Sequence, residues 1–236
     1  MLYGAAVEEA AGKGTVVAGT GTYSTAHSIH LTERADALGV DAFLIVTPYY
    51  NKPPSRGIVA HFRAIAAATE KPVVVYNIPG RVVINIDSET MTELAKIPNV
   101  VAVKQANDDL DQARRIVELG LTLYAGDDDL IIPFLELGGV GGICVHTHVV
   151  GPQVQEICRR WQAGDHDGAR ALDAEIRPSI DLLCAAPNPI AIKCALNLLG
   201  HGVGGHRLPL VEPSDAERAA VRDCLERLGL LAPAAV

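Results

Sequence analysis

The residues Val100-Val-Ala-Val-Lys104 form a short apolar run that ends in a lysine. A continuous apolar run of this length predicts a strand that is buried on both faces, as in a parallel sheet. Comparable runs occur at 15–20, 42–47, 72–76, 121–125 and 142–146, so the chain predicts six parallel strands.

Helix-like segments separate these runs. Apolar residues at helical spacing predict helices at 24–38, 55–68, 109–119 and 128–137, and Asp87 is placed to cap a further helix. This alternation predicts either a closed parallel barrel or an open doubly wound sheet. An open nucleotide-binding sheet would need a third glycine after Gly19 and Gly21 and an acidic residue ending the next strand. Because both are absent, we favour the barrel.

Beyond residue 150 only helices are predicted, at 152–163, 166–185, 189–199 and 214–228. We therefore expect a partial βα barrel over residues 1–150, and the last barrel helix with a C-terminal helical region over residues 151–236. A closed barrel of this type has eight βα units, of which about six are found here. Since the chain opens within a predicted helix at 2–11, we expect two strands to be missing before it.

The bulk composition argues against several classes of protein. Of the 236 residues, 49% are apolar and 20% are charged, as in ordinary soluble domains. The net charge of −8 opposes nucleic-acid binding, which needs clustered Lys and Arg. No apolar run reaches the ~18 residues of a membrane span and no signal peptide is found, so we expect a cytoplasmic protein with no membrane partner. The five cysteines lack C-x-x-C spacing and are expected to be reduced and mostly buried.

The active groups of parallel barrels lie at the carboxyl ends of the strands, where Lys104 stands out. A lysine that follows four apolar residues must point into the strand-lined interior or toward its mouth. Burial of an unpaired ammonium is costly, and desolvation lowers the pKa of a lysine instead. A neutral amine is what attack on a carbonyl requires. From spacing alone, an imine-forming amine and a lysine that extends into solvent are equally supported.

Other polar residues end neighbouring strands. Tyr76 could transfer protons at an imine, or it could be a core aromatic residue with a paired hydroxyl. Arg81 follows a Pro-Gly turn and could hold a substrate carboxylate or form a surface ion pair. Adjacent tyrosines in a strand point to opposite sides, so of Tyr49 and Tyr50 one is expected to face the site and the other a neighbouring subunit.

Metal binding is only weakly indicated. His146 and His148 are two residues apart in a predicted strand and would share a face, but the sequence places no third ligand. Asp127, Asp128 and Asp129 could suggest Mg²⁺, yet we expect them to cap the following helix. We therefore expect neither a metal nor a cofactor.

Four motifs, in order, resemble the dihydrodipicolinate synthase family. They are Val46-Thr-Pro-Tyr-Tyr-Asn51, Tyr76-Asn-Ile-Pro-Gly-Arg81, Val103-Lys104 and Ala125-Gly-Asp-Asp128, and the resemblance continues through Asn188-Pro-Ile and Arg207-Leu-Pro. It implies a (β/α)₈ TIM barrel with a helical C-terminal part, assembled as a homotetramer from two dimers. It also implies a lyase of lysine and diaminopimelate biosynthesis that condenses pyruvate with L-aspartate 4-semialdehyde.

The resemblance also implies roles for individual residues. Lys104 matches the Schiff-base lysine and Tyr76 the general acid/base. Tyr50 matches the tyrosine that reaches into a neighbouring subunit's site. Arg81 matches the arginine that binds the semialdehyde's carboxylate, and it favours the synthase over related sugar-acid lyases. The backbones of Gly126 and Ile143 match positions that line the pyruvate pocket.

Two departures from the family pattern matter. The family's Gly-Thr-Thr-Gly-Glu loop, which supplies a threonine to the proton relay, is absent from this sequence. An inactive truncated barrel therefore stays as an alternative, and so does a related pyruvate-dependent aldolase, because such aldolases share the lysine and the first tyrosine. The family's regulatory lysine site uses Asn and Glu where this chain has Tyr23 and His27. Because a carboxylate that would hold the ammonium of lysine is lost, we expect weak or no feedback inhibition.

Overall fold

The computed structural model describes residues 1–232 of the chain. The chain divides into two compact units, Met1–Ile143 and Cys144–Val236. Across residues 1–232, none of the helices combines the length and the apolar character that a membrane crossing demands.

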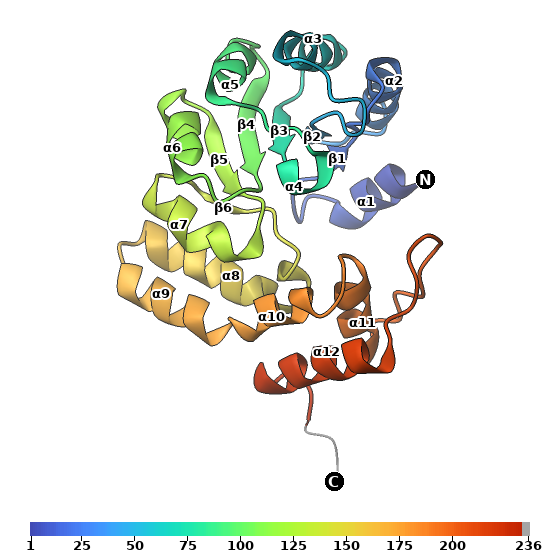
Figure 1. Cartoon of the computed structure of the whole chain (residues 1–236), viewed down its shortest axis with the longest axis vertical. Coiled ribbons are helices and arrows are strands. Elements are labelled where there is room, and N and C mark those ends of the chain that lie inside the picture. The colour runs from blue at the N-terminus through green and yellow to red at the C-terminus, as the bar shows by residue number, and fades with distance from the viewer. Residues whose placement is uncertain (233–236) are drawn as a thin grey trace. The chain divides into compact units, whose positions relative to one another are not determined.

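The first unit is built on a parallel sheet whose six strands are paired in the order of the sequence. Figure 1 shows that this sheet curves and that helices pack along its outer side. The strands are β1 (Val17–Gly19), β2 (Ala42–Val46), β3 (Val73–Asn77), β4 (Val100–Gln105), β5 (Thr122–Ala125) and β6 (Gly141–Gly142). The prediction of a partial parallel α/β barrel with six strands is confirmed.

Most residues of β2, β3 and β4 are buried, as their apolar sequence predicted, whereas Val17 of β1 and Val101 of β4 are exposed. Phe43, Ile45, Val75, Val103 and Leu123 are fully buried. Burial of a side chain of this size contributes about 1.5–3 kcal/mol relative to exposure. The sheet therefore forms a rigid base on which the residues at the strand ends are placed.

Helices connect the strands of the first unit, and polar caps fix where several of them begin. Ser24, Asp87 and Asp109 each accept a hydrogen bond from a backbone N–H three residues later, which satisfies a free donor of the first turn. The helices are α1 (Leu2–Ala10), α2 (Thr25–Asp36), α3 (Ser55–Ala66), α5 (Ser88–Leu94), α6 (Leu110–Glu118) and α7 (Ile131–Glu136), with the 3₁₀ turn η1 (Asp128–Leu130) before α7. A short helix, α4 (Pro79–Val82), was not predicted.

The last predicted strand is wrong beyond its first residue. β6 contains only Gly141 and Gly142, and the chain that follows turns into a helix. The reason lies in its partner, because β5 ends at Ala125 and the N–H of Ile143 donates to the Ala125 carbonyl at 2.9 Å. Beyond Ile143 no strand residue remains for the chain to pair with.

The second unit is helical in its described part, up to residue 232. Its helices are α8 (Thr147–Gln162), α9 (His166–Glu175), α10 (Pro178–Cys184), α11 (Ile190–Leu198) and α12 (Asp215–Arg227). Their apolar faces share a core that includes Leu182, Ala195, Val221 and Leu225.

Two helix predictions in this unit need correction. The single helix predicted at 166–185 is two helices, because Pro178 lacks a backbone N–H and opens α10 as its first residue. The helix predicted from residue 152 begins at Thr147 instead, and Val150 interrupts its first turns with non-helical angles two residues before Pro152.

Candidate active site

Strands β3 and β4 bring Tyr76 and Lys104 side by side. The two residues are direct partners in the parallel register. The Lys104 Nζ lies 4.1 Å from the centre of the Tyr76 ring, within the range of a cation–π contact. Lys104 is only 9% exposed, so its side chain does not extend into solvent. The pair thus unites an amine and a phenol in one largely buried place.

Thr47 forms hydrogen bonds with the backbone of Tyr76. It directly follows β2 and is fully buried. Its backbone N–H and its hydroxyl both donate to the Tyr76 carbonyl, at 3.0 and 2.9 Å. Sequence reasoning placed Thr47 at a strand end but gave it no such role, because the contact depends on the β2–β3 register.

A close approach of β5 to β4 places the acidic stretch near the lysine. The N–H of Gly126 donates to the Gln105 carbonyl at 2.7 Å. A Cβ at position 126 would lie 2.7 Å from the Cβ of Ala106 and 2.9 Å from the Gln105 oxygen, so only glycine fits there. Asp127 directly follows Gly126, and the charge of Lys104 acts on its carboxyl group.

The pKa of the Asp127 carboxyl depends on both basic residues of the site. Burial raises the pKa of its carboxyl, and the neighbouring carboxylates of Asp129 and Asp128 raise it further. The positive charges of Lys104 and Arg81 act in the opposite direction and lower this pKa. Asp127 therefore senses Lys104 and Arg81 together, which sequence reasoning missed because it treated the three aspartates as helix caps.

The capping prediction for these aspartates is only partly met. Asp127 occupies the N-cap position of η1, but its side chain makes no capping hydrogen bond there. Asp128 and Asp129 lie in the first turn of η1, where a negative charge is favourable.

The other residues carried over from the family lie around the same strand ends. Arg81 belongs to α4, which follows β3, and is exposed. The backbone N–H groups of Gly126 and Ile143 are already donated to carbonyls of β4 and β5. Any contact of these two residues with a substrate must therefore use other backbone atoms.

The two adjacent tyrosines do not lie in a strand, so the alternation argument for them is wrong. Strand β2 ends at Val46, and Tyr50 has a left-handed backbone with φ of 72°. Tyr49 is 38% exposed and packs edge-on against Tyr23, with ring centres 5.5 Å apart. Tyr50 is 91% exposed and is free to contact another molecule.

The proposed pair of histidines on one strand face is also wrong. His146 is the N-cap residue of α8 and His148 lies within that helix. His146 is fully buried, and its Nδ1 lies 3.1 Å from the Ser179 hydroxyl. His148 is exposed, so the two rings do not share a face.

The five cysteines are free thiols, as predicted, but most of them are not buried. Only Cys194 and Cys224 are buried, while Cys184 is exposed. Burial raises the pKa of the Cys194 and Cys224 thiols, which keeps them protonated and unreactive.

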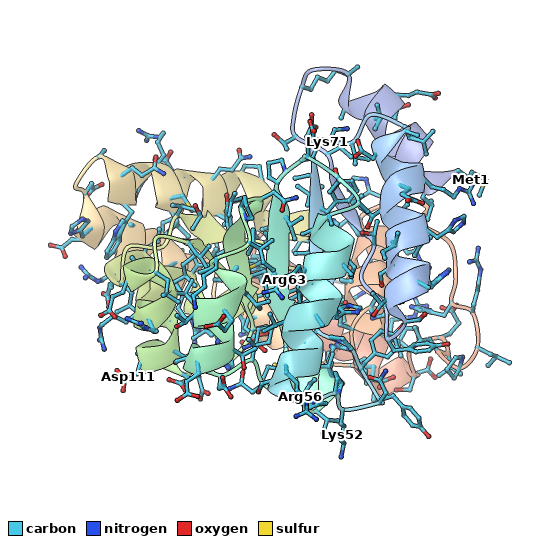
Figure 2. All side chains as sticks on the ribbon, turned by 90° about the horizontal axis from the view of Figure 1, so that it is seen from above. Met1, Lys52, Arg56, Arg63, Lys71 and Asp111 are labelled. Carbon is cyan, nitrogen blue, oxygen red and sulfur yellow. The ribbon has the colours of Figure 1, made fainter. Side chains whose placement is uncertain are left out.

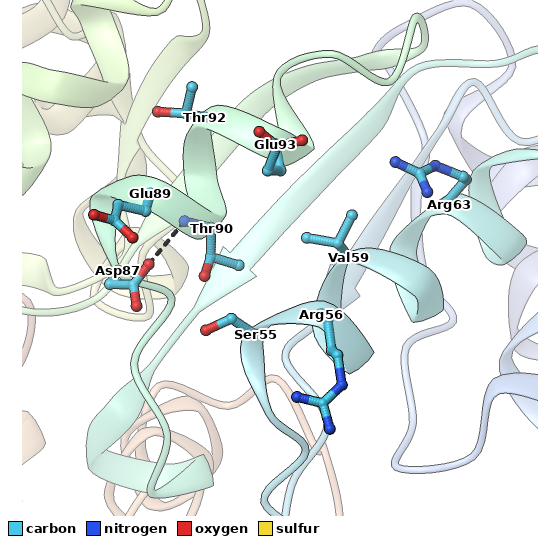
Figure 3. A pocket seen from close by; sticks show the side chains of 9 residues that line it. All are labelled: Ser55, Arg56, Val59, Arg63, Asp87, Glu89, Thr90, Thr92 and Glu93. Atoms are coloured by element: carbon cyan, nitrogen blue, oxygen red, sulfur yellow. Dashed lines mark hydrogen bonds between the residues drawn. The ribbon is translucent and has the colours of Figure 1, made fainter.

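A hollow of about 690 Å³ lies away from these strand ends, between α3 and α5 (Figure 3). Arg56 and Arg63 line it from α3, and Glu89 and Glu93 line it from α5. None of Tyr76, Lys104 and Arg81 contributes to its lining, so the hollow is separate from the candidate active site. Figure 2 places Arg56 and Arg63 along the outer layer of helices.

Comparison with known proteins gives a consistent result. The sequence model of the "Dihydrodipicolinate synthetase family" matches residues 1–228. A 4-hydroxy-tetrahydrodipicolinate synthase of Desulforudis audaxviator is 44% identical over 233 residues, which cover 98% of this chain and 79% of that protein.

Solved structures agree with the sequence comparison. A dihydrodipicolinate synthase from Cyanidioschyzon merolae with lysine bound superposes with a TM-score of 0.94 at 40% identity, covering 98% of this chain and 80% of that one. A chloride-inhibited enzyme from Acinetobacter baumannii, complexed with pyruvate, superposes with a TM-score of 0.93 at 36% identity, covering 97% and 80% of the two chains. This chain belongs to the dihydrodipicolinate synthetase family.

Proposed function

We propose that this chain acts as a 4-hydroxy-tetrahydrodipicolinate synthase, a lyase that condenses pyruvate with L-aspartate 4-semialdehyde in lysine and diaminopimelate biosynthesis. The observation that carries the proposal is the contact between the buried Lys104 and the half-buried Tyr76 at the carboxyl ends of adjacent strands, with Nζ 4.1 Å from the ring centre. Family membership and the position of Arg81 after β3 support it.

The reaction begins at Lys104. Its neutral amine attacks the pyruvate carbonyl carbon, and loss of water leaves an imine that draws electrons from the adjacent methyl group. Tyr76, which borders the amine, exchanges the protons of these steps and then accepts one from the methyl carbon, giving an enamine. Lys104 is only 9% exposed, so the imine forms in a setting that is largely shielded from bulk water.

The second substrate then enters beside Arg81. The enamine carbon attacks the aldehyde carbon, and the guanidinium holds the carboxylate of the semialdehyde. The amino group of this substrate attacks the imine carbon, closes the ring and releases Lys104. No electrons leave the substrates, so the cycle needs no redox cofactor.

Assembly belongs to the same proposal. Tyr50, at 91% exposure beside the site, contributes its hydroxyl to the site of a neighbouring subunit within a homotetramer. The exposed Tyr23 and Tyr49 provide apolar surface for that contact. A sedimentation experiment in which a fully active protein remains a monomer at assay concentration would contradict this part.

The first test is to trap the imine chemically. Incubation with pyruvate and sodium borohydride is expected to add a reduced three-carbon adduct to Lys104, located by mass spectrometry of its peptides. The same treatment without pyruvate is the control. An adduct on another lysine, or none at all, would refute the assignment of Lys104. Product analysis with the semialdehyde and with sugar-acid substrates then separates the synthase from a related aldolase.

A further inference from the structure

A group of amide side chains lies on the far side of the strands from Lys104 and Tyr76. We call it the amide cluster; it consists of Asn77, Asn85, Gln105, Asn107 and Gln112. Asn77 directly follows Tyr76 and Gln105 directly follows Lys104, and successive strand residues point to opposite faces. Both amides are fully buried. A polar cluster is unusual there, because this face of the strands packs against helices.

Hydrogen bonds within the amide cluster converge on one atom of α6. The Oε1 of Gln112 accepts from Asn107 Nδ2 at 3.0 Å, from Asn77 Nδ2 at 3.3 Å and from Gln105 Nε2. Asn77 Nδ2 also donates to Gln105 Oε1 at 3.1 Å. Buried amides that satisfy one another in this way select a single arrangement of their surroundings.

The amide cluster also connects the two ends of the segment that carries Arg81. This segment runs over residues 78–85, and the Asn77 side chain bonds to its far end. Asn77 Nδ2 donates to Asn85 Oδ1 at 2.6 Å, and Asn77 Oδ1 accepts the Ile86 N–H at 3.1 Å. Gln112 Nε2 adds a bond to the Ile86 carbonyl at 2.9 Å. Both ends of the segment are thus attached to the strand that bears Tyr76.

The backbone of the segment shows that it is held under strain. Val83 has φ of 75° and ψ of −33°, a conformation that a β-branched residue strongly disfavours. Its side chain is 65% exposed, so packing of that side chain does not explain the conformation. A strained backbone persists only where the surroundings impose it. The bonds at the base of the segment supply that constraint.

From these contacts we propose that the amide cluster is a positioning device for Arg81. It fixes the segment 78–85 so that the guanidinium meets the carboxylate of the aldehyde substrate, and it thereby sets the affinity for that substrate. The inference rests on the proposed function of the site. None of the five amides touches a substrate in this scheme; they act through Arg81.

The test is the variant Asn85→Ala, paired with the matched control Asn99→Ala. Asn85 acts only as an acceptor in the cluster, and without it Asn77 Nδ2 keeps its bonds to Gln105 and Gln112. Asn99 is an equally well-bonded amide, since its Nδ2 donates to the carbonyls of Ala66, Thr69 and Lys71 at 3.0–3.2 Å. It precedes β4, at the other end of the strands.

Asn85→Ala is expected to raise the KM for the semialdehyde by about 5–10-fold, with kcat and the KM for pyruvate within about twofold of the parent. Borohydride trapping of pyruvate on Lys104 should be unchanged. Asn99→Ala should lower the thermal midpoint without a selective change in KM. An unchanged KM in Asn85→Ala, or an equal rise in Asn99→Ala, would overturn the inference. Absence of trapping in the parent protein would instead refute the proposed function.

Discussion

The two ends of the parallel strands both carry buried or half-buried polar side chains, yet they use them differently. At the amino end, Lys71 pairs with Asp36 at 2.7 Å and Asn99 satisfies three backbone carbonyls. At the carboxyl end, Lys104 is more deeply buried and lies against the ring of Tyr76. In Figure 2, Lys71 is labelled near one end of helix α3, and Lys52 and Arg56 are labelled near its other end.

The difference shows how position along a strand decides what a lysine does. Lys71 is one-third exposed and its Nζ lies 2.7 Å from the Asp36 carboxylate, with which it forms an ion pair. Lys104 is only 9% exposed, and its Nζ lies 4.1 Å from the centre of the ring of Tyr76, the proposed general acid/base. The same residue type forms an ion pair at one end of the sheet and is the proposed nucleophile at the other.

The largest expected effect comes from replacing Lys104 with methionine, and Lys71→Met is the matched comparison. Lys104→Met should lower kcat/KM by at least about 1000-fold, because the nucleophile is lost, and should leave stability unchanged. Lys71→Met should keep the activity within about twofold and lower the free energy of unfolding by at most about 1 kcal/mol. Steady-state kinetics and urea unfolding measure the two quantities. Comparable loss of activity in both variants would show that the two ends of the strands do not differ in this way.

A medium effect is expected in the helical layer, where His61 of α3 is buried. Its Nδ1 lies 2.9 Å from the hydroxyl of Thr25, and burial lowers the pKa of His61 to about 4. In the unfolded chain the pKa is about 6.5. Between these values the unfolded state binds more protons, so stability falls as the pH drops from about 6.5 to about 4, by roughly 3 kcal/mol in total.

The variant His61→Gln isolates this contribution, since an amide can still bond to Thr25 but does not titrate. Urea unfolding at several pH values should show a shallower loss in the variant. The carboxyl of Asp36 does not interfere, because its bonds to Lys71 and Thr69 hold its pKa below the usual value and place its own loss of stability at lower pH. Identical pH profiles for the parent and the variant would contradict the role of His61.

The smallest effect concerns feedback by lysine at the start of α2. Tyr23 is 58% exposed, and the ring of His27 stacks on that of His30 with centres 6.4 Å apart. With no carboxylate at position 27, L-lysine at about 1 mM is expected to change the rate by less than about a fifth. His27→Glu restores a carboxylate and serves as the contrasting variant. Strong inhibition of the parent at micromolar lysine would show that the site works without that group.

The sequence predicted most of the strands because their apolar runs match double burial. It failed at β6, where Gly141 and Gly142 carry no apolar signal and where the length of β5 decides how far pairing continues. It also joined α9 and α10, although Pro178 is a readable break. The local apolar pattern thus located the strands well. It failed where a neighbouring strand or a single proline sets the boundary of a strand or helix.

The candidate site was partly readable from the sequence. Polar residues after apolar strands pointed to Tyr76 and Lys104, and parallel pairing then placed them together. The environment of Asp127 and the amide cluster were not foreseen, since they depend on register and on loop ends distant in sequence. One signal was present, because Asn77 and Gln105 continue the strands on the helix-facing side, where an apolar residue would be expected.

The attachment of segment 78–85 at its base has a consequence for protein engineering. Asn77 fastens the far end of the segment through its side chain. The exposed positions between those points can therefore be exchanged without disturbing the strands, whereas Val82 is buried and has to be kept. Libraries that vary residues 79–81, 83 and 84, with Asn77, Val82 and Asn85 retained, are expected to alter which aldehydes are accepted while the pyruvate chemistry proposed for Lys104 is preserved. In the proposed mechanism, the choice of acceptor is thus separated in the fold from the formation of the nucleophile.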